Sequence, residues 1–139
     1  MSLSKAFTTE NTAVTVNGRL ITDFGTAEQP ITEEFINPKR TLVQGVGGNA
    51  VVLERKKQGL RLTLSLMAGS PDSAFMHGLY MTGGTVTYGR MQVGSADLVG
   101  ATEGVVVNES AITRGGASSI SDDVYVIEFN SCTSMRGGE

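Results

Sequence analysis

An alternating run of leucines places the strongest constraint on how this chain can fold. Between Leu60 and Leu66, leucine alternates with arginine, threonine and serine, which is the pattern of a strand with one buried face. The residues that follow predict a helix over 71–82. Ser70 can cap this helix, and Pro71 suits its first position because the N–H that proline lacks has no partner there. Gly83 can end the helix by adopting a positive φ.

The predicted helix has one apolar side. Phe75 and Leu79 are four positions apart in the sequence, so both side chains lie on the same side of a helix. We therefore expect Phe75 and Leu79 to pack against a sheet formed by the rest of the chain.

The remaining sequence predicts strands joined by turns. Asn17-Gly18 lies between two apolar runs and predicts a tight hairpin, because both residue types tolerate positive φ. The residues between 94 and 100 read as a loop. The predicted strands occupy residues 13–17, 19–24, 31–36, 50–57, 60–66, 85–93, 104–113 and 124–130. This order predicts a mainly β protein, an antiparallel sandwich or partly closed barrel with one short flanking helix, in a single domain over residues 1–139.

Three segments show no strand or helix pattern. Residues 1–12 and 131–139 are polar, and we expect both to be flexible arms. Residues 37–49 contain three glycines and little periodicity, which predicts a long flexible loop. Long loops in small domains are often functional, so this segment is the first candidate for an interaction element.

Charge is distributed unevenly along the chain. Six basic residues and one acidic residue lie between Lys39 and Arg61, for a net charge of +5, whereas the remainder has five basic and 13 acidic residues, for a net charge of −8. One interpretation is a basic element that meets an acidic face on another copy of the protein. The other is a solvated basic edge strand, since lysine on an edge discourages unwanted pairing.

The residues of catalytic and metal sites are scarce. His77 is the only histidine, and five positions separate it from Asp72, so a catalytic triad with Ser73 is not expected. Cys132 is the only cysteine, which excludes an internal disulfide. The neighbouring carboxylates at 122–123 lack the further oxygen ligands that calcium needs. We expect no enzyme activity, no cofactor, no metal site and no small-molecule substrate.

Two further classes of protein are not supported by the sequence. The glycines at 45–48 precede an apparent strand rather than a helix N-terminus, which argues against a phosphate-binding loop. No apolar run has the length of roughly 20 residues that a membrane helix requires, and the first residues lack the apolar core of a signal peptide. We therefore expect synthesis in the cytoplasm and no membrane contact.

The order of the elements resembles that of phage tail tube proteins. A hairpin, a glycine-bearing loop and a strand are followed by the leucine strand, the turn Ser70-Pro71-Asp72-Ser73, a short helix and further strands, over about residues 13–132. The resemblance implies a structural subunit that forms hexameric rings. Such rings stack into a hollow tube through which DNA leaves the capsid without specific binding. It also implies partner proteins such as sheath, terminator and tape measure, and a place in the virion tail after assembly in the bacterial cytoplasm.

The resemblance suggests roles for particular residues. We expect Lys39, Arg40, Gly45, Gly47 and Gly48 to contribute to contacts between stacked rings. Glu109 and Glu128 are candidates for the lumen, because an acidic lumen does not bind DNA phosphates; both could equally lie on the outer surface.

Two other functions remain open. One is the tube subunit of a bacterial contractile injection or secretion system, and the other is a non-catalytic β-sandwich binding module of a larger particle.

Overall fold

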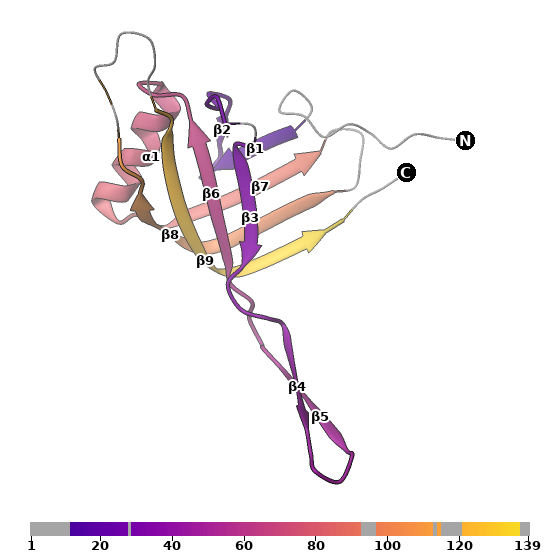
Figure 1. Cartoon of the computed structure of the whole chain (residues 1–139). Coiled ribbons are helices and arrows are strands. Elements are labelled where there is room, and N and C mark those ends of the chain that lie inside the picture. The colour runs from indigo at the N-terminus through magenta and orange to yellow at the C-terminus, as the bar shows by residue number, and fades with distance from the viewer. Residues whose placement is uncertain (1–11, 28, 93–96, 113, 115–120, 137–139) are drawn as a thin grey trace.

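The computed structural model describes residues 12–27, 29–92, 97–112, 114 and 121–136 (Figure 1). The described part of the chain holds one helix, α1 (Pro71–Thr82), and strands that form a seven-stranded antiparallel sheet, in the order β2-β1-β7-β8-β9-β6-β3, and a separate pair, β4-β5. The strands are β1 (Thr12–Val16), β2 (Arg19–Ile21), β3 (Ile31–Phe35), β4 (Arg40–Gln44), β5 (Ala50–Glu54), β6 (Leu60–Leu66), β7 (Val86–Gln92), β8 (Leu98–Glu109) and β9 (Asp123–Met135).

The predicted hairpin and the leucine strand are both confirmed. β1 and β2 pair around Asn17 and Gly18, whose φ angles of 52° and 82° are those that a tight hairpin turn requires. The alternate leucines of β6 are buried and form the centre of the apolar core. β6 lies between β3 and β9, so its buried face meets side chains from both neighbours.

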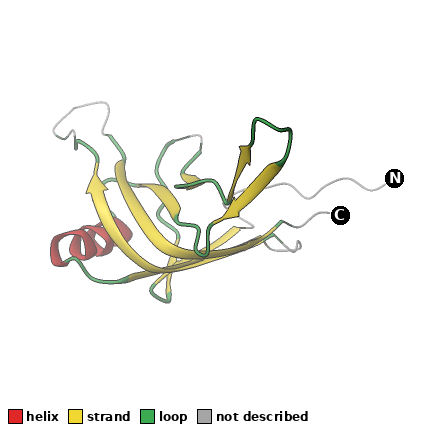
Figure 2. Cartoon of the chain, turned by 90° about the horizontal axis from the view of Figure 1, so that it is seen from below, coloured by secondary structure: helices red, strands yellow, loops and turns green. Residues whose placement is uncertain are grey.

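The main sheet curls so strongly that strands distant in its order meet across its concave side. Glu33 of β3, at one edge of the sheet, contacts Tyr88 and Arg90 of β7, which lies four strands away. After β2 the chain crosses to the other edge, where Phe24 forms an isolated bridge with Leu66. Figure 2 shows the curvature of the long strands. The predicted fold class is therefore confirmed: a mainly antiparallel β fold with one flanking helix, in which the sheet stops short of a closed barrel.

Two predicted boundaries are wrong. β8 begins at Leu98, inside the predicted loop at 94–100, and β9 continues to Met135, inside the predicted flexible arm at 131–139. Each segment is ordered by the other, because Leu98 to Thr102 pairs in register with Ser131 to Met135. The other predicted arm, residues 1–12, lies outside the described residues except for Thr12, which belongs to β1.

Helix α1 has the bounds and caps that the sequence predicts. The Ser70 side chain accepts a hydrogen bond from the N–H of Ser73, Pro71 occupies the first turn, and Gly83 ends the helix with a φ of 69°. Phe75 and Leu79 are half-buried against the core, whereas Met76 is fully buried. The helix lies beside the curved sheet (Figure 2).

The predicted loop at 37–49 instead contains strand β4, at Arg40–Gln44, and a turn that leads into β5. β4 and β5 form an antiparallel hairpin that projects from the end of β3 and β6 (Figure 1). We call residues 39–55 the arm, because the N–H of Arg55 donates to the carbonyl of Lys39 at its base. The glycines that suggested a loop lie in its turn, where Gly48 has a φ of 92°. The loop prediction was wrong because it treats the glycines of the turn, at 45–48, as evidence for a loop over the preceding residues, which form β4.

Candidate assembly surfaces

The arm is exposed along its whole length. Every residue of β4 and β5 is exposed, including apolar side chains that a monomeric domain would ordinarily bury. The exposed apolar residues are Leu42, Val43, Val46, Val51, Val52 and Leu53. Because a two-stranded hairpin alone in water is marginally stable, this element has the composition of one that is covered by a partner.

The residues predicted to contact other rings all lie on the arm. Lys39 and Arg40 are at its base, where Arg40 forms an exposed ion pair with Glu54 at 3.2 Å. Gly45 accepts a hydrogen bond from the N–H of Gly48 and donates one to the carbonyl of Asn49, so the tip is a defined turn. The arm thus carries positively charged residues where it joins the body, apolar residues along its strands and glycines at its tip.

The convex side of the sheet is a second exposed surface, which we call the open face. Two rows of residues in register define its ends. One row, Met91, Leu98 and Met135, runs across β7, β8 and β9, and each of its side chains is at least 40% exposed. The other row, on β3, β6, β9 and β8, consists of Glu34, Arg61, Glu128 and Val105.

The two candidate lumen residues lie in different places. Glu128 is on the open face, where its carboxylate pairs with Arg61 at 2.9 Å. Arg61 also pairs with Glu34 at 2.7 Å, so this cluster carries two carboxylates for one guanidinium. The side chain of Glu109 is only 9% exposed and contacts Nδ1 of His77 on α1 at 2.9 Å. Glu109 therefore contributes to the contact between β8 and the helix.

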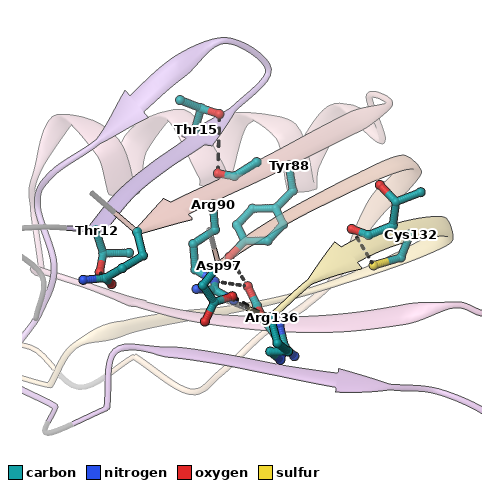
Figure 3. A network of polar contacts seen from close by, with 11 residues as sticks. Thr12, Thr15, Tyr88, Arg90, Asp97, Cys132 and Arg136 are labelled. Atoms are coloured by element: carbon teal, nitrogen blue, oxygen red, sulfur yellow. Dashed lines mark hydrogen bonds and ion pairs between the residues drawn. The ribbon is translucent and has the colours of Figure 1, made fainter. Parts of the chain in front are cut away.

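A polar network fills the concave side of the sheet where β3 meets β7 (Figure 3). Glu33 accepts two hydrogen bonds from Arg90, at 2.7 and 3.0 Å, and a third from the Tyr88 hydroxyl. Asp97 pairs with both Arg90 and Arg136 at 3.5 Å. Burial, reinforced by the Glu33 carboxylate, raises the pKa of Tyr88, and the hydrogen bonds to Glu33 raise the pKa of Arg90. Both residues keep their protons at any physiological pH, so the network has a structural role.

A second set of polar contacts fixes the helix to the sheet. Asp72 accepts hydrogen bonds from the N–H groups of Thr22 and Asp23, at 2.9 and 3.0 Å, and pairs with Arg19 at 2.9 Å. Burial opposes the charge, but these hydrogen bonds dominate and lower the pKa of Asp72. The sequence offered Asp72 only as a doubtful catalytic acid, whereas the structure gives it a role in positioning α1.

Most residues that the sequence analysis weighed as candidates for catalysis or metal binding make contacts within the fold. The Ser73 hydroxyl donates to Asp123 and contacts the Tyr125 hydroxyl at 3.0 Å. Burial is the main cause that raises the pKa of Tyr125 to about 12 and also raises the pKa of the Cys132 thiol. Asp122 accepts hydrogen bonds from Thr26 and Ala27, which fixes a turn. In the described ranges, no group of three or more metal-ligating side chains is present.

The arm was the main surface that the sequence analysis described wrongly. Two short apolar runs, Leu42-Val43 and Val51 to Leu53, belong to strands joined by a five-residue connection that contains glycine, and this is a recognised hairpin signal. The contact of Glu33 with Arg90 had no comparable signal, because it depends on the curl of the sheet. Among the residues described, no helix is long and apolar enough to cross a membrane.

Comparisons with known proteins identify a shared fold. No family model and no curated protein matches the sequence. Among solved structures, a chain of the anti-feeding prophage cap, which terminates the tube of that particle, superposes with a TM-score of 0.58 at 9% identity, over 97% of this chain and 94% of that chain. A chain of the anti-feeding prophage baseplate gives a TM-score of 0.44 at 12% identity, over 91% of this chain and 88% of that chain. Only the first likeness is close enough to establish a common fold.

Proposed function

We propose that this chain is a non-catalytic structural subunit of the tube of a phage-like particle. Hexameric rings of the chain stack into a hollow conduit, through which DNA passes in a phage tail. The observation that carries this proposal is the arm, an apolar element whose side chains are exposed in the described part of the chain. The fold shared with a tube-terminating cap supports the same class of particle.

In this proposal the arm makes the contact between rings. Lys39 and Arg40 at its base meet acidic residues of the next ring, and the turn with Gly45, Gly47 and Gly48 enters that ring. Head-to-tail contacts of this kind leave a free surface at each end, which is how a stack of rings extends. Complementary charge then sets the polarity of the stack.

The open face lines the lumen in this proposal. Its cluster of Glu34, Arg61 and Glu128 carries a small net negative charge, which disfavours contact with DNA phosphates. Glu109 has no part in the lumen here, because its side chain faces α1. The particle also holds sheath, terminator and tape measure proteins as partners, and it assembles in the bacterial cytoplasm.

A second candidate function is the tube-terminating cap itself. The likeness in fold to the anti-feeding prophage cap favours this alternative specifically. A subunit that terminates a tube needs to bind the tube on one side only, whereas a tube subunit must bind its own copies on two opposite sides.

Negative-stain electron microscopy of the purified chain, over a series of concentrations, distinguishes these functions. Tubes of stacked rings support the tube subunit. Single rings that do not stack at any concentration support the cap. Monomers at all concentrations contradict both functions and favour a binding module. If tubes form, the neighbouring genes separate the two kinds of particle: an operon without capsid genes favours an injection system over a phage tail.

A further inference from the structure

The arm is apolar on both of its faces. Residues directly opposite in an antiparallel pair have side chains on the same face, and successive residues alternate between faces. Leu42 is opposite Val52, which defines the first face, and Val43 is opposite Val51, which defines the second. Leu53 extends the second face toward the base.

Neither face is covered by another of the described segments. On the first face Leu42 and Val52 are 65% and 57% exposed, and on the second face Val43 and Val51 are 50% and 60% exposed. A hairpin that rests on one surface needs only one apolar face, and its other face is ordinarily polar. Exposed apolar side chains in the middle of both faces indicate that the arm is covered from both sides.

Charge identifies the covering surfaces as copies of this chain. The arm and the two lysines that follow it, residues 39–57, contain five basic residues and one acidic residue, for a net charge of +4, and the remaining residues carry a net charge of −7. The base of the arm therefore complements the body of another copy. A flat surface that covers one face of a two-stranded hairpin leaves the opposite face free, so two covered faces point to two bodies.

We infer that each arm inserts between two neighbouring copies of the chain, so that its two faces bind two different subunits. This inference rests on the proposed function, because it identifies the partners of the arm within the assembly. As a consequence, each arm links three chains, namely its own and the two neighbours that it contacts. An arm then has its full binding surface only where two neighbours already sit side by side, which makes growth cooperative.

Matched substitutions on the two faces provide the first test. Val51→Thr and Val52→Thr change adjacent, similarly exposed valines on opposite faces, and both keep the β-branched shape that suits a strand. Burying an unpaired hydroxyl should raise the concentration at which assembly begins by about tenfold for each variant, measured by sedimentation. Val107→Thr on β8, whose valine is 43% exposed, is the matched control and should leave that concentration unchanged.

The outcomes separate this inference from the proposed function. An effect of both arm variants supports an arm covered on both faces. An effect of only one variant contradicts the inference while the proposed contact through the arm stands. If neither variant alters assembly, both the inference and the proposed role of the arm are wrong.

Photo-crosslinking counts the neighbours directly. A chain with a photoreactive amino acid at both positions 51 and 52 is mixed with a large excess of unlabelled chain, assembled and irradiated. Under denaturing conditions, covalent species of three chains are expected, since each labelled arm reaches two unlabelled subunits. Products of only two chains would show that one neighbour covers both faces, which overturns the inference even if both threonine variants weaken assembly.

Discussion

The carboxylate of Asp72 joins two segments that are far apart in the sequence. It belongs to the first turn of α1, binds two backbone N–H groups that follow β2, and pairs with Arg19 inside β2. Asp123 likewise binds both Ser73 of the helix and Arg114. Single buried acids therefore hold the helix in place, in addition to the half-buried Phe75 and Leu79.

The depressed pKa of Asp72 predicts a specific pH dependence of stability. Its ordinary value is 3.8, and the folded chain lowers it, so the carboxylate stabilises the fold above that value. This contribution is lost as the pH falls through the folded-state pKa. In urea melts, Asp72→Asn should cost about 1–3 kcal/mol at neutral pH and should flatten the loss of stability below about pH 4. An unchanged acid profile in the variant would contradict this role.

Gly104 is a position where the sheet has no room for a side chain. It lies opposite Phe129 in β9, and a Cβ at this glycine would overlap the Phe129 ring. Gly104→Ala should therefore cost about 1–3 kcal/mol in the free energy of unfolding, as overpacking does elsewhere. Gly78→Ala on α1 is the control, since a Cβ there meets open space and alanine favours a helix, so stability should rise slightly. Equal effects of the two substitutions would count against the packing account.

At the scale of elements, the sequence predicted correctly those elements that are determined by neighbouring residues. The caps of α1 and the Asn17-Gly18 hairpin were both placed correctly, because a few adjacent residues fix each of them. The ends of β8 and β9 were not, because each is ordered by pairing with the other, as Gly100 pairs with Thr133 across 33 positions of the sequence. The arm shows the intermediate case, in which a hairpin signal was present but the glycine content hid it.

The contact between β3 and β7 predicts different costs for two adjacent glutamates. Glu33 is 11% exposed and binds Arg90, whereas Glu34 is 58% exposed and pairs with Arg61. Glu33→Gln leaves the buried Arg90 undercompensated, so it should cost about 3–5 kcal/mol in chemical denaturation. Glu34→Gln on the same strand should cost less than about 1 kcal/mol. Similar losses from both variants would mean that the curl of the sheet does not depend on the Glu33 contact.

At the scale of the whole molecule, the described residues form a well-packed body and one projecting element, the arm, whose apolar side chains are exposed. The body buries its apolar residues on the concave side of a curled sheet, while the arm leaves apolar residues on both faces in solvent. The sequence could predict the fold class, since the alternation of apolar and polar residues and the cap residues of the helix are local patterns. It could not predict the shape of the arm or the placement of Glu109 and Glu128, because these depend on how strands far apart in the chain are arranged.

The central claim is that the arm drives self-assembly, and sedimentation velocity of the chain with and without the arm tests it most directly. In the arm-deleted variant, an Asn-Gly turn replaces residues 41–53, which keeps Arg40 and Glu54 paired and leaves the body intact. Circular dichroism should show that the variant remains folded. We predict that the full chain forms large assemblies as its concentration rises, whereas the folded variant does not stack at any concentration tested. Equal assembly of the two proteins, or a full chain that stays monomeric throughout, would contradict the account.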